Sequence, residues 1–163
     1  MLNQLFSNII WGQKGNFLDV PTDCPQRDER LGWTGDAQVF VRTACLNYDA
    51  EKFFTKWLAD LASDQHDDGY VGHVIPDLLQ NPQASSAWGE AAAICPWQVY
   101  LAFGNKQILK NQYQSMKKWI DYITSTTTIF LPFSISHIPM FIITFVSSFI
   151  YFVSITIIFY HHI

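Results

Sequence analysis

Apolar and polar residues follow a helical spacing from the first residues of the chain. Over residues 2–13, apolar side chains recur at the i, i+3, i+4 and i+7 positions that form one face of a helix: Leu2, Leu5, Phe6, Ile9 and Ile10. The mainly apolar run 37–46 (AQVFVRTACL) predicts a second, buried helix, with Thr34 or Asp36 available as its N-cap. We therefore expect two helices, one before and one after a connecting loop.

Residues 49–62 (DAEKFFTKWLADLA) predict a third, amphipathic helix with Asp49 as its N-cap. Its large apolar residues fall on one side, which we expect to be buried: Phe53, Phe54, Trp57, Leu58 and Leu61. Trp57 lies in the middle of this apolar face. We therefore expect Trp57 to belong to the core and not to a binding site.

Turn-forming residues interrupt the helical pattern between residues 63 and 85. The stretch contains Asp67-Asp68-Gly69, Gly72, Pro76 and Asn81-Pro82. Such residues favour irregular backbone, and a loop of this length in a compact domain is often functional. Asp67 and Asp68 fit a solvated turn, with substrate contact as the alternative. The aspartate spacing of a calcium-binding loop is absent.

Trp88 stands at a junction between this loop and the next helical pattern. Ser85 or Ser86 is placed to cap a new helix, and Glu90 falls near its first turn. Judged by its neighbours alone, Trp88 fits a packing residue at a helix start as well as it fits a pocket residue.

Two further helices are predicted after Trp88. The run 91–103 (AAAICPWQVYLAF) is apolar, and we expect Pro96 to kink it or to begin a new helical segment. Gly104 and Asn105 end this run. The stretch 105–124 is strongly amphipathic, with these residues on its apolar face: Ile108, Leu109, Tyr113, Met116, Trp119, Ile120 and Ile123.

The composition changes abruptly after Asp121, beyond which the chain contains no Asp, Glu, Lys or Arg. Residues 140–159 form an apolar run that is long enough to cross a bilayer as a helix. We therefore divide the chain into residues 1–125 and a hydrophobic tail, 126–163, with 140–159 as a candidate transmembrane helix. If the tail is genuine, it places the protein at a membrane.

Two other interpretations of the tail compete with a membrane span. Its β-branched and aromatic residues also fit an aggregation-prone strand in water. A misread reading frame or an unspliced intron would likewise explain so sharp a change of composition. If the tail is not genuine, the protein is expected to be soluble.

Charge and cysteine content narrow the classes of function. The chain has 10 basic and 14 acidic residues and a net charge of -4, so it lacks the basic stripe that a nucleic-acid partner requires. Cys24, Cys45 and Cys95 are widely spaced and fit no C-x-x-C pattern, which argues against a zinc site and against a disulfide framework. We expect neither a metal nor a cofactor.

The stretch 23–36 (DCPQRDERLGWTGD) concentrates the charged chemistry of the chain. Proline and glycine make it an irregular loop between helices, and loops on a rigid scaffold often carry catalytic groups. Arg27 and Arg30 are expected to neutralise some of its four carboxylates, and a carboxyl group left unpaired would have a raised pKa and serve as a general acid. Trp33 offers a flat apolar face of the kind that sugar rings pack against. The loop is therefore predicted to bind carbohydrate.

This stretch, together with the preceding NFLDVPT of residues 16–22, closely resembles the signature of the bacterial-type α-L-rhamnosidases. The resemblance extends over roughly residues 2–124. It implies an all-α fold, a six-hairpin (α/α)6 barrel, and an inverting enzyme that removes terminal α-L-rhamnose from glycosides or polysaccharides. Because such a barrel needs twelve helices, we expect this chain to hold only part of one, followed by a hydrophobic C-terminal helix.

By this resemblance, Glu29 is the general acid that protonates the departing glycosidic oxygen. The other residues of the signature, with a tryptophan further along, are implied to bind the sugar: Asp23, Arg27, Trp33, Asp36 and Trp88. Inversion also requires a second carboxylate about 6.5–9.5 Å away. No part of the chain resembles the family segment that supplies this base, so we expect the chain alone to have little or no activity.

Three hypotheses stay open. The chain is either such a fragment of an enzyme or a non-catalytic, membrane-anchored sugar-binding remnant. A six-hairpin glycosidase with another substrate, but with Glu29 still as the acid, is the third hypothesis.

Overall fold

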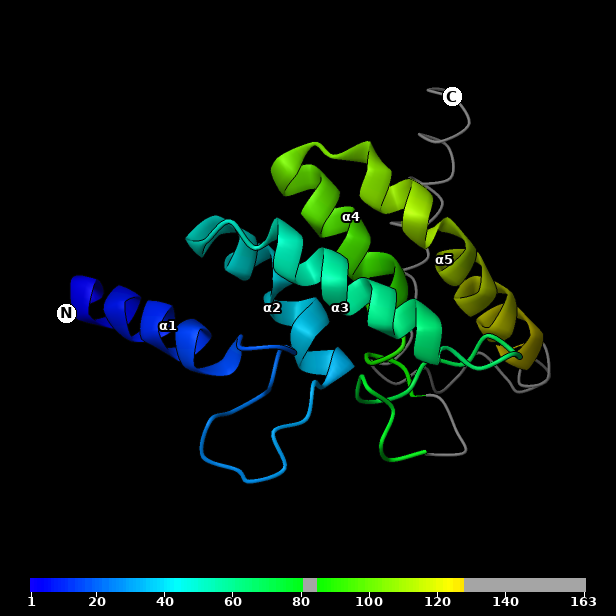
Figure 1. The fold of residues 1–163 in the computed structure, drawn as a ribbon, viewed down its shortest axis with the longest axis horizontal. Helices are drawn as coiled ribbons and strands as arrows, with labels where there is room; N and C mark the ends of the chain where they lie inside the picture. Colours follow the sequence, from blue (N-terminus) through cyan, green and yellow to red (C-terminus); the bar gives the residue numbers. More distant parts are fainter. Residues whose placement is uncertain (81–84, 128–163) are drawn as a thin grey trace, which may run out of the picture. The chain divides into compact units, whose positions relative to one another are not determined.

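The computed structural model describes residues 1–80 and 85–127, and Met1–Tyr122 forms the compact unit that carries the candidate site. Helices joined by loops make up this part of the chain (Figure 1): α1 (Leu2–Asn16), α2 (Thr34–Asn47), α3 (Glu51–Asp64), α4 (Ala91–Phe103) and α5 (Lys106–Thr127). The described ranges contain two isolated β-bridges but no strand. The predicted all-α class is confirmed for these residues.

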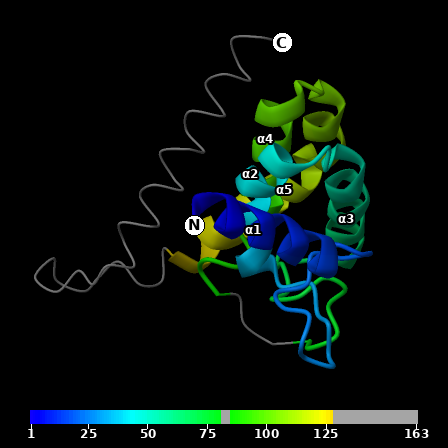
Figure 2. The ribbon, with the colours of Figure 1, turned by 90° about the vertical axis from the view of Figure 1, so that its left-hand side faces the viewer.

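α4 is the central helix of the compact unit. It packs against both α2 and α3, as the two views in Figures 1 and 2 agree. A helix that is apolar on most sides belongs in a core, and α4 buries most of its circumference, although Leu101 near its end is 57% exposed. The buried residues are Ala91, Ala92, Ala93, Cys95, Pro96, Trp97 and Val99. The start of α4 is therefore held firmly, and so is the turn that precedes it.

The apolar face of α3 forms a second part of the core, as predicted. Phe54, Trp57 and Leu58 are fully buried. Trp57 Nε1 donates a hydrogen bond to the carbonyl oxygen of Ile75 at 3.4 Å, so its one polar group is satisfied inside the core. The half-buried Phe53 stacks on Phe17, with ring centroids 4.7 Å apart. This stack ties the loop after α1 to α3.

Two loops, 17–33 and 65–80, are hydrogen-bonded to each other beside the site. The Thr34 N–H donates to the His73 carbonyl at 2.9 Å, and the Ile75 N–H donates to the Gly32 carbonyl at 2.9 Å. Between these bonds, Trp33 and Val74 form an isolated antiparallel bridge. The end of the acidic loop is thereby attached to a segment that lies about forty residues further along the chain.

α1 contacts the rest of the unit mainly through its C-terminal half. Gln13 Nε2 donates to the Ala44 carbonyl at 3.2 Å, and Asn47 Nδ2 donates to Gln13 Oε1 at 3.0 Å. The predicted helix is confirmed, but its apolar face is exposed in the first turns, at Leu2, Leu5 and Phe6. Apolar spacing identifies a helix without identifying what covers it, and nothing within the described ranges covers this face.

The predicted side-chain N-cap of α2 is wrong. The N-cap residue is Trp33, and no side chain caps the helix. Thr34 is unavailable because its hydroxyl donates to the carbonyls of Gly72 and His73. Those acceptors lie in a distant loop, which local sequence does not reveal. α2 is also less buried than predicted, since Val39 is 80% exposed.

The predicted starts of α3 and α4 also need correction. α3 has Ala50 as its N-cap, although Asp49 Oδ1 still accepts the Glu51 N–H at 3.4 Å. α4 begins at Ala91 and not at a serine cap, because Ala87 has a left-handed backbone (φ 71°) that no helix can include. Pro96 lies inside a continuous α4 and so does not begin a new helical segment, whereas the alternative of a kink stays a prediction.

The buried face of α5 is rotated slightly from the predicted one. Ile108, Met116 and Trp119 are buried as expected, whereas Tyr113 is 48% exposed and Gln112 is buried in its place. The buried positions advance at the helical period, which puts residue 112 and not 113 on the inner face.

The predicted membrane helix, 140–159, lies outside the described residues. Among the residues that the structure describes, no helix is both long enough and apolar enough to cross a membrane.

Candidate active site

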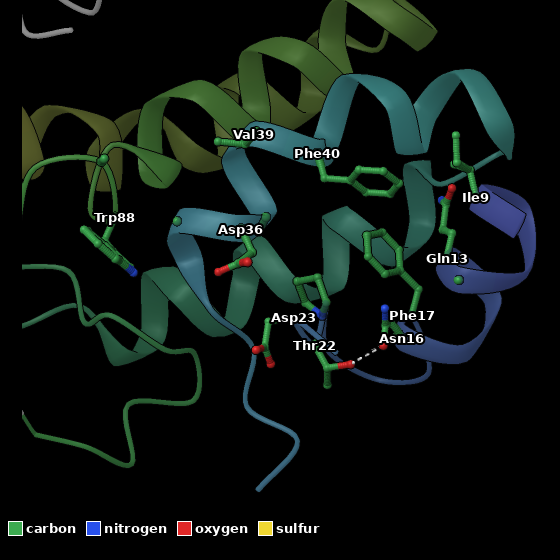
Figure 3. Close-up of a pocket in the computed structure, with 15 residues that line it drawn as sticks. Ile9, Gln13, Asn16, Phe17, Thr22, Asp23, Asp36, Val39, Phe40 and Trp88 are labelled. Atoms are coloured by element: carbon green, nitrogen blue, oxygen red, sulfur yellow. Dashed lines mark hydrogen bonds between the residues drawn. The ribbon is translucent and has the colours of Figure 1, made fainter. Parts of the chain in front are cut away.

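A cavity of about 610 Å³ lies where α1, α2 and the turn before α4 meet (Figure 3). Its wall is formed by the end of α1 with the following loop, by the start of α2, and by the turn before α4. The residues most relevant to a ligand are Asn16, Phe17, Asp23, Asp36, Phe40 and Trp88. Figure 3 shows the two carboxylates and the indole on one side of the cavity, and Ile9, Gln13 and Phe40 on the other.

A tight turn at the end of α1 sets the position of Asp23. Thr22 Oγ1 donates to the carbonyl oxygen of Asn16, the last residue of α1, at 3.0 Å. Phe17 and Pro21 form an antiparallel bridge that closes the same turn. The chain therefore leaves the turn at Asp23 in a fixed direction, along the cavity wall.

Arg27 joins two carboxylates of the acidic loop. Its Nη1 lies 3.2 Å from Asp23 Oδ2 and 3.7 Å from Glu29 Oε1. The Asp23 side chain is only 13% exposed, whereas those of Arg27 and Glu29 are 56% and 41% exposed. Arg27 thus neutralises part of the cluster as predicted. Glu29 lies outside the cavity wall and is linked to it through Arg27.

Asp23 keeps one oxygen unused. Its Oδ2 accepts hydrogen bonds from Arg27 and from the Cys24 thiol, at 3.2 Å each. Its Oδ1 is buried and has no hydrogen-bond partner among the described residues. A buried acceptor without a partner is unfavourable, so Asp23 Oδ1 is suited to accept a hydrogen bond from a ligand hydroxyl.

Asp36 lies in the first turn of α2 and faces the cavity. Partial burial raises the pKa of the Asp36 carboxyl group, and the carboxylate of Asp23 raises it further. The Asp36 backbone N–H and the Arg27 guanidinium act in the opposite direction. The predicted carboxyl group with a raised pKa therefore occurs at Asp36.

The Trp88 indole rests against the start of α2, where a glycine makes room for it. A Cβ atom on Gly35 would lie 2.9 Å from Trp88 Nε1 and 3.0 Å from the Ala87 carbonyl oxygen. On its other side, Trp88 meets the edge of the His73 ring at a centroid distance of 5.6 Å. Trp88 Nε1 is buried without a hydrogen-bond partner among the described residues. The indole is thus fixed by packing and keeps its donor for a ligand.

Trp33 lies beside the cavity and not in its wall. It is half-buried at the N-cap of α2, and its backbone is bridged to Val74. Its Nε1 is also buried without a hydrogen-bond partner among the described residues.

Of the predicted site residues, the structure therefore brings Asp23, Asp36 and Trp88 together at one cavity. Arg27 contacts Asp23 from outside, and Glu29 contacts Arg27. Sequence reasoning assigned no role to several other residues of the wall, including Asn16, Phe17 and Phe40. Asn16 and Phe17 belong to the NFLDVPT stretch of the family signature. That stretch was the one feature of the sequence that could have predicted their place at the site.

Two carboxylates and an unpaired indole N–H thus meet at one cavity of a helical domain, within the residues that the structure describes. Residues 1–134 match the model of the bacterial alpha-L-rhamnosidase six-hairpin glycosidase domain. The chain belongs to this family.

Curated relatives of this chain agree with the family match. An alpha-L-rhamnosidase of Formosa agariphila is 49% identical over 140 residues, which is 86% of this chain and 15% of that protein. An alpha-L-rhamnosidase of Streptomyces avermitilis is 47% identical over 123 residues, which is 76% of this chain and 12% of that protein. The chain thus spans only a small part of the length of these relatives.

Solved structures show the same helical arrangement. The alpha-L-rhamnosidase from Dictyoglumus thermophilum superimposes with a TM-score of 0.75 at 37% identity, over 78% of this chain and 14% of that chain. The Streptomyces avermitilis alpha-L-rhamnosidase, solved as a complex with L-rhamnose, superimposes with a TM-score of 0.70 at 45% identity, over 76% of this chain and 12% of that chain. The helices described here are consistent with a fragment of a six-hairpin glycosidase.

Proposed function

We propose that the chain is part of an inverting α-L-rhamnosidase that removes terminal α-L-rhamnose from glycosides or polysaccharides. The observation that carries this proposal is the meeting of Asp23, Asp36 and Trp88 at one cavity, with Asp23 Oδ1 and Trp88 Nε1 buried and unpaired. A pyranose needs such a combination, since its ring packs on a flat apolar face and its hydroxyl groups require donors and acceptors.

Each residue of the acidic loop has a role in this proposal. Asp23 and Asp36 hold the rhamnose hydroxyl groups from the cavity wall. Arg27 orients Asp23 through their 3.2 Å ion pair, and Arg27 also contacts the sugar. Trp88 forms the platform under the ring, with Trp33 beside it. Each of these roles fits the polarity and the position of the side chain.

Glu29 is proposed as the general acid. Its carboxyl group is accessible, with 41% of the side chain exposed, at the outer side of the loop whose inner side carries Asp23. The departing oxygen of a sugar bound at the wall would lie on this open side, where the aglycone can extend into solvent. A positioned acid of this kind contributes about 10²–10⁴-fold to the rate.

An inverting enzyme also needs a base that activates water from the opposite face of the ring, about 6.5–9.5 Å from the acid. Asp23 and Asp36 are assigned to sugar binding, and the chain covers 12% to 15% of its relatives. We propose that the base comes from a part of the barrel outside residues 1–125, so that this chain alone has little or no hydrolytic activity.

The test supplies the missing part of the barrel. Residues 1–124 of this chain would replace the matching segment of the Streptomyces avermitilis relative, and hydrolysis of aryl α-L-rhamnosides would be followed in the chimera. We expect turnover by the chimera and little or none by the isolated chain. Glu29→Gln should lower the rate by about 10²–10⁴-fold for a phenyl leaving group. The loss should be smaller for dinitrophenyl, which departs without protonation.

The matched control is Glu51→Gln in the same chimera, since Glu51 lies in the first turn of α3, outside the residues that line the cavity. Robust turnover by the isolated chain would refute the proposal of a missing base. Equal losses with Glu29→Gln for both leaving groups would refute the assignment of Glu29 as the acid.

A membrane-anchored, non-catalytic sugar-binding remnant is the second candidate, favoured by the apolar run 140–159. It predicts detergent-dependent solubility, and an L-rhamnose affinity that survives Glu29→Gln but not Trp33→Ala. Solubility without detergent would exclude it.

A further inference from the structure

His73, in the loop 65–80, does not line the cavity but contacts two of the segments that do. Its carbonyl oxygen accepts hydrogen bonds from the N–H and from Oγ1 of Thr34, at 2.9 and 3.0 Å. Thr34 is the first residue of α2, and Asp36 lies in the same first turn. The backbone of His73 is therefore attached to the helix end that carries one of the two carboxylates of the site.

The imidazole ring of His73 contacts the second segment, the turn that carries Trp88. The ring centroids of His73 and Trp88 lie 5.6 Å apart, and the two ring planes cross at 65°. Aromatic pairs favour this edge-to-face arrangement. Gly35 is packed against the same indole, since a Cβ atom on Gly35 would lie 2.9 Å from Trp88 Nε1. The indole is thus held by contacts with both His73 and the start of α2.

A polar contact fixes the imidazole ring in turn. His73 Nε2 and Ser85 Oγ lie 2.7 Å apart, at hydrogen-bond distance. The Ser85 carbonyl oxygen accepts the Trp88 N–H at 3.3 Å, so Ser85 belongs to the same turn as the indole that the ring contacts. His73 therefore meets this turn twice, at Ser85 through a ring nitrogen and at Trp88 through the ring itself.

The contacts of His73 are divided between its backbone and its side chain. The backbone carbonyl holds α2, whereas the ring holds the Trp88 turn. A change of the side chain therefore removes the contacts with the turn and leaves the attachment to α2 in place. The orientation of the indole matters because Trp88 Nε1 is buried without a hydrogen-bond partner among the described residues. A hydrogen bond from this donor to a ligand would weaken steeply if the indole were misaligned.

We propose that His73 is a positioning residue of the sugar site: its imidazole ring, held by Ser85, fixes the orientation of the Trp88 indole at the cavity wall. Its backbone holds the helix end that carries Asp36 beside this indole. The inference rests on the proposed function, and it assigns His73 no contact with the sugar.

The first test follows the indole N–H of Trp88 by hydrogen exchange. With isotopically labelled tryptophan, each of the six tryptophans of the chain gives one indole N–H signal in the NMR spectrum, and Trp88→Phe identifies that of Trp88. Because Trp88 Nε1 is buried, its exchange should be slow in wild type, and His73→Ala should accelerate it by about tenfold or more. The Trp57 indole N–H, which is hydrogen-bonded in the core, should keep its rate.

Two further variants separate the ring from its anchor. His73→Phe keeps an aromatic ring beside the indole, and its exchange rate should lie closer to wild type than that of His73→Ala. Ser85→Ala keeps the imidazole ring but removes the hydroxyl group that holds it. It should accelerate exchange in the wild-type background and have no further effect in the His73→Ala background.

His66→Ala is the matched control, because His66 lies in the same loop and its ring contacts Tyr70. It should leave the exchange rate of the Trp88 indole unchanged. An unchanged rate in His73→Ala, or an equal acceleration in His66→Ala, would overturn the proposal. If His73→Ala does not fold, Ser85→Ala decides, and an unchanged rate in that variant would overturn the proposal.

A second readout connects the indole to the sugar, through calorimetric titration of the full chain with L-rhamnose. His73→Ala should weaken binding by about tenfold. In a Trp88→Phe background, where no indole N–H is left to position, the same change should cost less, with a non-additivity of about threefold or more. Additive effects would overturn the proposal. If wild-type protein does not bind L-rhamnose, the proposed function fails, while the exchange rates still decide on His73.

Discussion

At the scale of the residue, the site is defined by polar atoms that the fold buries and leaves unpaired. Asp23 Oδ1, Trp88 Nε1 and Glu90 Oε2 lack hydrogen-bond partners among the described residues, and all three belong to the cavity wall or to the turn that supports it. Such atoms cost stability. Other buried atoms without a partner, such as Tyr70 OH and Ser115 Oγ, lie outside the cavity wall. It is their place at the cavity that makes Asp23 Oδ1 and Trp88 Nε1 candidates for ligand binding.

The buried carboxyl group of Glu90 should make stability depend on pH in a characteristic direction. Burial raises its pKa in the folded chain, so ionisation opposes folding. The penalty is absent below the ordinary glutamate pKa and develops as pH rises through the ordinary value and then the folded one. The free energy of unfolding of Glu90→Gln, relative to wild type, should therefore be higher near neutrality than at about pH 3, as urea denaturation at both pH values would show.

Asp67→Asn, at an exposed position in the loop after α3 and measured in the same way, corrects for effects common to any such exchange. A difference between Glu90→Gln and wild type that stays constant or falls with rising pH would contradict the assigned burial of the carboxyl group.

Residue chemistry was predictable where it depends on neighbours in sequence. The density of carboxylates, arginines and an indole in 23–36 predicts a polar site, and three of the six predicted site residues line the cavity. The raised pKa was expected for an unpaired carboxyl group, but its location at Asp36 depends on the approach of Asp23 and on the cavity. These are tertiary facts that the local pattern does not contain.

At the scale of the element, helical periodicity predicted every helix in the described ranges, whereas the helix ends depended on distant partners. Thr34 does not cap α2, because its hydroxyl bonds to the loop at Gly72 and His73. Pro96 does not begin a new helix, because its neighbours Cys95 and Trp97 are buried with it and this turn of α4 is held by packing.

The close approach of α2 to the Trp88 turn leads to a prediction for Gly35. An alanine Cβ at this position would lie 2.9 Å from the Trp88 indole nitrogen. Gly35→Ala should therefore displace the indole, weaken L-rhamnose binding, and lower the free energy of unfolding by about 1–3 kcal/mol through overpacking. Calorimetric titration and urea denaturation measure the two effects.

Gly15→Ala is the matched control, because Gly15 lies in α1 and a Cβ there meets nothing within 4 Å. It should bind L-rhamnose as wild type does and be at least as stable. If the two alanine variants behave alike, Trp88 does not pack on Gly35 as described.

At the scale of the whole molecule, the centre of the compact unit is tightly packed, whereas the apolar side chains in the first turns of α1 are exposed. Leu58 on α3 is fully buried, whereas Leu5 on α1 is 56% exposed. Leu58→Ala should lower the free energy of unfolding by about 2–5 kcal/mol. Leu5→Ala should change it by at most about 0.5 kcal/mol. Chemical denaturation of the two variants tests the contrast, and a similar cost for both would mean that α1 is covered as thoroughly as α3.

The family could be predicted from the sequence, but the complete catalytic machinery could not. The 23–36 signature identified the family because it is long and ungapped, and the family model matches residues 1–134. The chain spans 12% to 15% of its curated relatives. Under the proposed function, the base belongs to a part of the barrel outside residues 1–125, so this segment could not predict it.

The central claim is that the cavity between α1, α2 and the Trp88 turn binds L-rhamnose through Asp23, Asp36 and Trp88. Calorimetric titration of the chain with L-rhamnose tests it most directly, with D-glucose as the competing sugar, and with Asp36→Ala and the surface change Asp19→Asn as paired variants. The account predicts saturable binding of L-rhamnose by wild type and by Asp19→Asn, and binding weaker by about tenfold or more in Asp36→Ala. Equal affinity of all three proteins for L-rhamnose, or no preference for it over D-glucose, would contradict the account.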